Sequence, residues 1–215
     1  IGGTGSGKST LVNLIPRFYD AASGQVLVDG MDVKDVSLSS LREKIGVVPQ
    51  KAVLFKGTLR ENMLWGREDA TDEEIYQALD IAQAREFVED KGQGLELPIA
   101  QNGRNLSGGQ RQRLTIARAL VREPQILILD DSASALDYAT DARLRKAIRE
   151  NTGDTTVFLV SQRAASVKNA DQILVLDDGQ IVDSGTHRDL LNRCQLYREI
   201  CLSQLTKEEV ERDAQ

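Results

Sequence analysis

The residues best suited to chemistry stand at the beginning of the chain, in the segment IGGTGSGKS. Gly2, Gly7, Lys8 and Ser9 match the spacing G-x-x-x-x-G-K-[ST] completely. Glycines in such a segment let backbone N–H groups curl around phosphate oxygens at the start of a helix. Lys8 then adds a positive charge, and Ser9 offers a hydroxyl group to Mg²⁺. The spacing therefore predicts a phosphate-binding loop rather than a simple glycine-rich turn, and we call residues 2–10 the phosphate loop.

A pair of carboxylates follows a short apolar run in the second half of the chain. Ile126 to Leu129 is too short for a helix and is typical of a strand buried on both faces of a parallel sheet. Asp130 and Asp131 come directly after it, at the end where open α/β sheets place their ligands. Such acids could hold a cation, orient a water molecule or cap a nearby helix. Because a phosphate loop is present, we pursue the metal-and-water interpretation.

Two further polar segments stand where elements end or begin. Gln50 follows an apolar run over residues 45–48, and it is either a site residue or the first residue of a loop. The segment Leu106-Ser107-Gly108-Gly109-Gln110, which we call the signature segment, opens a helix. Its free N–H groups and the helix dipole offer a second anion site, unless Ser107 simply caps the helix.

The residues with these functions are expected to be positioned by strands and helices that alternate along the chain. Short apolar runs predict strands over residues 25–28, 31–33, 45–48, 126–129, 156–160 and 173–176, with residues 181–182 completing a hairpin. Helices are expected after the phosphate loop, over residues 38–44, after Ser107 and over residues 138–150. Capping-box patterns at Thr58 and Thr71 begin two more helices, so the region up to about Gly94 should form a helical lobe. Within it we expect Trp65 and Phe87 to be packing residues.

The C-terminal part offers little chemistry. A last helix should begin after Thr186, and the charged tail over residues 207–215 is expected to be loose. His187 is the only histidine, and without a second metal ligand nearby in sequence it is predicted to be structural. Cys194 and Cys201 lie too far apart on a helical pattern to bridge each other, so we expect plain thiols in a reducing compartment.

The composition excludes some classes of protein. The 215 residues suffice for one substantial domain, and 40% hydrophobic with 28% charged residues is ordinary for a soluble globular chain. The net charge of −6 and a sequence pI of about 5.0 argue against nucleic acid as a partner. No apolar run approaches the roughly 20 residues of a membrane helix, and no signal peptide is visible. Membrane association would therefore need a partner or another part of the chain.

The phosphate loop, Gln50, the signature segment, the acid pair and the segment SALD at residues 134–137 occur in that order. This ordered set resembles the nucleotide-binding domain of an ABC transporter, over essentially all 215 residues. The signature segment followed by a buried strand ending in aspartate is very specific, whereas the phosphate loop is shared with many ATPases and GTPases. The resemblance implies an α/β fold of P-loop NTPase type: a mostly parallel sheet with flanking helices, a small antiparallel portion and an inserted helical lobe.

The same resemblance implies one domain over residues 1–215. Residues 1–57 and 106–215 would form the ATPase core, and residues 58–105 approximately would form the helical lobe and the loop before the signature segment. Only Ile1 precedes the phosphate loop, which should follow a buried strand, so we expect the sequence to begin inside a longer protein.

In this family two domains stack head to tail around two ATP molecules, so the resemblance implies ATP and Mg²⁺ as cofactors. Ser9, Gln50 and Asp130 would contact Mg²⁺, and residues 134–137 would communicate between the two sites. The expected ATP-binding residues are Gly3, Thr4, Gly5, Ser6, Gly7, Lys8, Ser9, Thr10 and Gln50, with Ser107, Gly108, Gly109 and Gln110 reaching the ATP held by the other domain.

Two positions depart from the family pattern at the catalytic site. The family's catalytic base is a glutamate, but Asp131 stands there, one methylene shorter and less able to reach the attacking water. Gln162 replaces the switch histidine that contacts the γ-phosphate, and glutamine cannot become cationic. Residues 100–105 also lack the glutamate typical of exporters. With an intact signature segment, this combination resembles the degenerate half of a heterodimeric exporter, expected to bind ATP tightly and hydrolyse it poorly.

The segment from Leu54 to Asn62 resembles exporters of drugs or lipids more than importers. The implied partners are a second, non-identical nucleotide-binding domain and transmembrane domains in the same full-length chain, at the cytoplasmic face of the plasma membrane. A regulatory ATP-binding module without turnover, a homodimeric exporter and a soluble ATPase of nucleic-acid metabolism remain alternatives. The acidic pI and the exporter-like segment disfavour the last of these.

Overall fold

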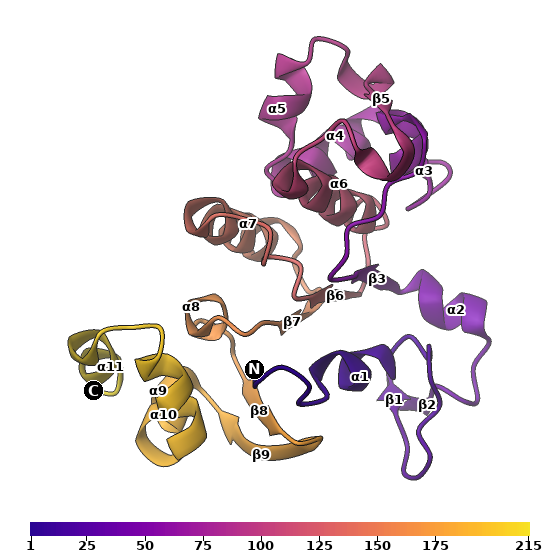
Figure 1. The fold of residues 1–215 in the computed structure, drawn as a ribbon. Helices are drawn as coiled ribbons and strands as arrows, with labels where there is room; N and C mark the ends of the chain where they lie inside the picture. Colours follow the sequence, from indigo (N-terminus) through magenta and orange to yellow (C-terminus); the bar gives the residue numbers. More distant parts are fainter.

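A parallel three-stranded sheet forms the centre of the molecule in the computed structural model, which describes residues 1–215 (Figure 1). The strands are β3 (Ile45–Val48), β6 (Ile126–Asp130) and β7 (Thr156–Val160), and β6 lies between the other two. Ile45 pairs with Ile126, and Ile126 pairs with Thr156. Because the strands are parallel and in step, the polar residues that follow them meet at one edge of the sheet.

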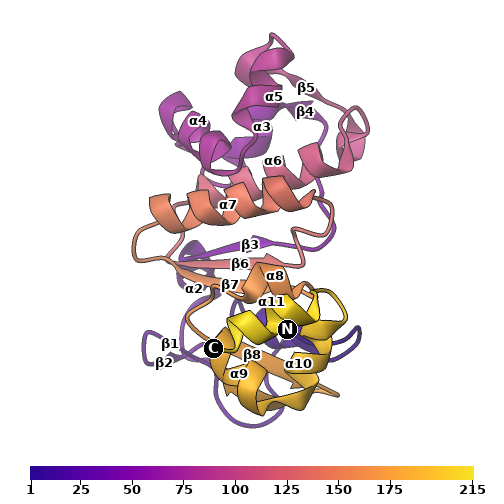
Figure 2. The ribbon, with the colours of Figure 1, turned by 90° about the vertical axis from the view of Figure 1, so that its left-hand side faces the viewer.

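The side chains of β6 explain why the sheet is covered on both faces. Leu127 and Leu129 point to one face, where they join a cluster of 26 buried residues that includes the helices α6 (Gly108–Leu120) and α7 (Tyr138–Asn151). Ile128 points to the other face and packs with Val12 of α1 (Lys8–Asn13). Figure 2 shows α6 and α7 on one side of the three strands and α8 (Ala164–Val167) on the other. Because successive side chains of a strand point to opposite faces, the sheet is covered by helices on both sides and the centre of the molecule has three layers.

The remaining elements are short and surround this centre. The other helices are α2 (Leu38–Glu43), α3 (Leu59–Leu64), α4 (Asp72–Ile81), α5 (Arg85–Asp90), α9 (His187–Arg193), α10 (Gln195–Leu202) and α11 (Lys207–Asp213), with 3₁₀ turns at Gly94–Glu96 and Gln101–Gly103. Three antiparallel pairs join β1 (Leu27–Val28) to β2 (Met31–Asp32), β4 (Gly57–Thr58) to β5 (Pro98–Ile99), and β8 (Ile173–Asp177) to β9 (Gln180–Gly185). None of the helices combines the length and apolar character needed to cross a bilayer.

The sheet is interrupted between β7 and β8, which do not pair with each other. A cavity of about 910 Å³ lies there, lined mainly by hydrophobic side chains from α1, α7, β7 and β8. Ile1 extends the β8 edge, because its terminal amino group donates to the Leu174 carbonyl at 2.8 Å and its own carbonyl accepts from the Leu176 N–H at 2.8 Å. The phosphate loop therefore starts beside β8.

The helical lobe gathers at one end of the molecule, with α6 between it and the sheet (Figure 1). Thr58 and Thr71 form the capping boxes that the sequence predicts, each with a glutamate three residues later. Phe87 is buried, as expected, but the prediction for Trp65 is wrong. Trp65 caps the C-terminus of α3, remains 68% exposed and contacts the Phe55 ring, with 5.0 Å between the ring centroids.

The capping box of α4 provides a test of the lobe. We expect Thr71→Ala to lower the free energy of unfolding by about 1 kcal/mol, because the Thr71 hydroxyl accepts from the Glu74 N–H at the start of the helix. Chemical denaturation measures the change. Thr71→Ser retains the acceptor and is the matched control; equal losses in the two variants would contradict a capping role.

The C-terminal helices correct the expected end of the chain. The helix after Thr186 is not the last, because α10 and α11 follow it, and residues 207–213 form α11 rather than a loose tail. Thr206 caps α11 with a capping box, and Val210 is fully buried in a second cluster of 11 residues. His187 is structural, as predicted: its Nδ1 lies 2.7 Å from the Tyr197 hydroxyl. Cys194 and Cys201 are buried free thiols in the same cluster, though not on one helix.

Candidate functional site

The phosphate loop is a concave stretch of backbone that ends in α1. Gly5 and Gly7 have φ values of 82° and 91°, in the left-handed region that glycine tolerates without strain. The N–H groups of Gly5, Gly7 and Lys8 donate to no carbonyl of the chain. The turn between β8 and β9 supports the loop from below, since the Gly179 N–H donates to the Ser6 carbonyl at 3.2 Å. Free donors on a curved backbone suit an anion with several oxygens.

Lys8 closes the loop with its side chain. Its Nζ donates to the carbonyls of Gly2 and Gly3 at 2.9 and 2.6 Å and lies 3.2 Å from the Ser6 hydroxyl. Burial lowers the pKa of Lys8 below its ordinary value, while the charges of Asp131 and Asp130 oppose this shift. The ammonium group is therefore held near the free N–H groups, where it adds a charge for an anion.

Ser9 and Asp130 meet across the sheet edge. The Ser9 hydroxyl donates to Asp130 Oδ1 at 2.8 Å, which joins the first turn of α1 to the end of β6. Asp130 is only 8% exposed. A hydroxyl group and a carboxylate are the hard oxygen ligands that Mg²⁺ binds together with water and phosphate. The pair fits a cation beside the phosphate loop.

Asp131 takes a different direction from its neighbour. Its φ of 46° turns the chain out of the strand, and its Oδ2 accepts from Gln50 Nε2 at 3.2 Å. Burial raises the pKa of Asp131 above its ordinary value, with Asp130 adding to the shift and the hydrogen bond from Gln50 opposing it. Gln50 thus lies beside Asp131 at this edge of the sheet, a contact that was not foreseen, and its contact with Mg²⁺ stays a prediction.

The segment after β7 reaches the same edge; we call Ser161–Arg163 the switch segment. Gln162 accepts from the Thr4 hydroxyl at 3.5 Å, so it lies over the phosphate loop. Arg163, which sequence reasoning missed, donates to the carbonyls of Ser134 and Leu136 at 3.2 and 3.3 Å. Only its position beside Gln162 could have drawn attention to it. The switch segment therefore connects the phosphate loop to residues 134–137.

The signature segment stands apart from these groups. Ser107 caps α6 by accepting from the Gln110 N–H at 3.2 Å, and the Gln110 side chain accepts from the Ser107 N–H at 3.0 Å. No hydrogen bond joins either residue to Lys8 or to the acid pair. Gly108 and Gln50 line a shared cavity of about 510 Å³ on that side. The structure thus gathers the predicted residues from the phosphate loop, β3, β6 and β7, but not those at the start of α6.

This parallel sheet, with a phosphate loop running into a helix and an acid at the end of the buried central strand β6, defines a P-loop nucleotide-binding domain. The family model described as "ABC transporter" matches residues 1–134, which is more than half of the chain. The chain belongs to the ABC transporter family, and the resemblance seen in its motifs is confirmed.

Known relatives agree with this assignment. The chain is 47% identical over 208 residues to the uncharacterized ABC transporter ATP-binding protein YfiB of Bacillus subtilis, covering 97% of this chain and 36% of the relative. It is 44% identical over 200 residues to a putative multidrug export ATP-binding/permease protein of Staphylococcus aureus, covering 93% and 35%. The chain therefore spans about a third of the length of the curated relatives it matches.

A solved structure gives the same picture. A bacterial Atm1-family ABC exporter with ATP bound superimposes with a TM-score of 0.92 at 38% identity, over 96% of this chain and 36% of that one. The predicted fold class, a mostly parallel α/β sheet with flanking helices and small antiparallel portions, is confirmed by this likeness and by the topology of the sheet.

Proposed function

We propose that this chain is the ATP-binding part of a membrane exporter, and that it holds ATP and Mg²⁺ at the edge of its parallel sheet. The observation that carries the proposal is the Ser9–Asp130 hydrogen bond beside free backbone donors and the Lys8 ammonium. The phosphate-contacting residues would be Gly3, Thr4, Gly5, Ser6, Gly7, Lys8, Ser9 and Thr10, with Ser9, Gln50 and Asp130 around Mg²⁺.

The chain's own site would hydrolyse ATP slowly. A general base must come within hydrogen-bond reach of the water whose proton it takes. Asp131 is one methylene shorter than glutamate, and its Oδ2 is already engaged by Gln50. Gln162 lies over Thr4, where its amide would donate a hydrogen bond to the terminal phosphate but, unlike a histidine, could not carry positive charge. Both features weaken catalysis and leave the groups that bind phosphate unchanged, so ATP would be retained.

The signature segment would serve a second domain. Ser107, Gly108, Gly109 and Gln110 lie away from this chain's own phosphate loop, at the start of a 13-residue helix whose dipole favours an anion. A partner that stacks head to tail would bring its nucleotide there. We infer a non-identical partner with an intact catalytic glutamate, because turnover of the pair then occurs at the site that this chain's signature segment completes.

The relatives support a membrane setting for the full-length protein. The Staphylococcus aureus relative is named an ATP-binding/permease protein, and this chain covers 35% of it. We infer transmembrane domains in the same full-length protein, which would place this domain at the cytoplasmic face of the plasma membrane. The reaction would be ATP hydrolysis coupled to transport, with low intrinsic activity in this chain alone.

Nucleotide binding and turnover of the full-length protein, purified without a partner, test this function. We expect ATP to bind and remain bound, with turnover near the background of an ATP solution, and turnover to appear when a competent partner is added. Substantial ATPase activity of the unaccompanied protein would instead indicate a homodimeric exporter. Binding without turnover in the presence of any partner would indicate a regulatory module.

A further inference from the structure

The switch segment is held from behind by a residue far away in sequence. Gln204, in the turn after α10, donates from Nε2 to the Gln162 carbonyl at 2.8 Å. Its Oε1 accepts from the Ala164 N–H at 2.9 Å. The Gln204 side chain thus bonds to the backbone on both sides of Arg163. One of these bonds is to Gln162, whose side chain accepts from Thr4.

One of these two hydrogen bonds replaces the side-chain cap that α8 lacks. Ala164 is the first residue of α8, and Arg163, at the N-cap position, provides no side-chain hydrogen bond to the helix. A helix start leaves N–H groups that need an acceptor, and Ala164 is fully buried. Gln204 supplies the missing acceptor and also fixes the carbonyl two residues earlier, so the backbone direction at Gln162 depends on it.

Gln204 is itself fixed by the end of α10. The N–H groups of Gln204 and Leu205 donate to the Cys201 carbonyl at 3.0 and 2.8 Å, and Thr206 then caps α11. Cys201 and Tyr197 of α10 are fully buried in the same cluster as Ala164 and Val167 of α8. The turn that carries Gln204 is therefore anchored on both sides by packed helices.

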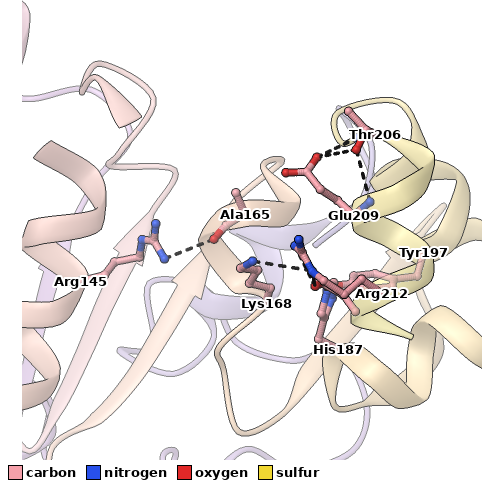
Figure 3. Close-up of polar contacts among 9 residues, drawn as sticks. Arg145, Ala165, Lys168, His187, Tyr197, Thr206, Glu209 and Arg212 are labelled. Atoms are coloured by element: carbon pink, nitrogen blue, oxygen red, sulfur yellow. Dashed lines mark hydrogen bonds and ion pairs between the residues drawn. The ribbon is translucent and has the colours of Figure 1, made fainter. Parts of the chain in front are cut away.

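The other end of α8 is tied to α11. Lys168, the residue after α8, and His187 lie beside Arg212 at the end of α11 (Figure 3). Asp213 Oδ2 lies 3.6 Å from Lys168 Nζ and 3.4 Å from His187 Nε2. Burial alone would raise the pKa of Asp213, but Lys168, His187 and Arg212 lower it below its ordinary value. From the opposite side, Arg145 of α7 donates to the Ala165 carbonyl at 3.3 Å. These contacts hold α8 against α11 at one end and against α7 in the middle.

We propose that Gln204 is a positioning residue for the nucleotide site: it sets the backbone of the switch segment so that the Gln162 side chain faces the phosphate loop. The inference rests on the proposed contact of Gln162 with the terminal phosphate of ATP. The C-terminal helices then contribute to nucleotide discrimination without touching the nucleotide. If one peptide group of the switch segment rotated, the Gln162 side chain would point away from Thr4. The phosphate loop itself would keep its conformation.

The test is the ratio of ATP affinity to ADP affinity in the full-length protein. Gln204→Met keeps the length of the side chain and removes both hydrogen bonds. We expect it to lower the affinity for ATP about fivefold and to leave that for ADP unchanged, as the loss of one net hydrogen bond predicts. Gln195→Met is the control, because Gln195 is exposed on α10 and its side chain donates a hydrogen bond to Glu199 of the same helix. Both affinities should be unchanged in this control.

Gln162→Ala, measured in parallel, separates the two proposals. An unchanged affinity ratio in Gln162→Ala would overturn the proposed role of Gln162. A lowered ratio in Gln162→Ala together with an unchanged ratio in Gln204→Met would overturn only the positioning role of Gln204. Equal losses of ATP and ADP affinity in Gln204→Met would also overturn it, since that is a general structural effect. Gln204→Glu, which keeps the acceptor for Ala164 and loses the donor, replaces Gln204→Met if the latter does not fold, with the same expected ratio.

Discussion

Replacing Asp131 with glutamate and Gln162 with histidine together is expected to raise ATP turnover at this chain's own site by about 100-fold or more, which is the range of a positioned general base. The added methylene carries the carboxylate beyond the Gln50 amide, which now holds Asp131 Oδ2 at 3.2 Å. Histidine at position 162 stands over Thr4 and can carry positive charge toward the terminal phosphate. The phosphate loop is unchanged and residue 162 keeps a hydrogen-bond donor, so the affinity for ATP should not fall.

A variant whose side chain at position 131 has the length of glutamate but cannot act as a base tests the role of the carboxylate. Asp131→Gln combined with Gln162→His has the shape of the activated variant, and its amide cannot accept a proton from water. We expect this variant to bind ATP and to remain at background turnover in a phosphate-release assay on the full-length protein. Equal turnover in the glutamate and glutamine variants would show that the carboxylate at position 131 does not act as the general base.

The fold could be predicted where the signal is local. Ile126 to Leu129 is apolar throughout, and the structure buries Leu127 and Leu129 on one face and Ile128 on the other. Capping boxes at Thr58 and Thr71 placed two helix starts correctly. The prediction of a loose tail was wrong because it relied on the many charged residues and overlooked a local helix signal. Thr206 and Glu209 form a capping box, and the buried Val210 packs the helix against the rest of the chain.

Predictions that depend on tertiary contacts were harder. Trp65 lies at the end of α3, and nothing in the sequence shows that this end faces solvent. The acid pair was recognisable, but only the structure shows that Asp130 meets Ser9 and Asp131 meets Gln50. Gln204 gives no sequence signal at all, because its partners are 40 and 42 residues away.

A second large effect is expected at Lys8. Lys8→Met should weaken ATP binding about 100-fold, because the ammonium group makes charge-assisted hydrogen bonds that contribute about 1.5–3 kcal/mol each. The side chain keeps nearly the same length and loses its charge and donors. In the structure these donors bond to the carbonyls of Gly2 and Gly3. Equilibrium binding of ATP by the full-length protein measures the change.

The stability of the nucleotide-free protein distinguishes lost binding from lost folding. Burial lowers the pKa of Lys8, so the folded state disfavours its charged form, and methionine removes that cost along with the loop's internal hydrogen bonds. These two changes oppose each other, and we expect the melting temperature without nucleotide to stay close to that of the unmodified protein, while the stabilisation by added ATP disappears. Lys91→Met, on an exposed turn of the helical lobe, makes the same change in net charge and should retain both ATP binding and the stabilisation. Stabilisation by ATP that survives in Lys8→Met would place the nucleotide elsewhere on the molecule.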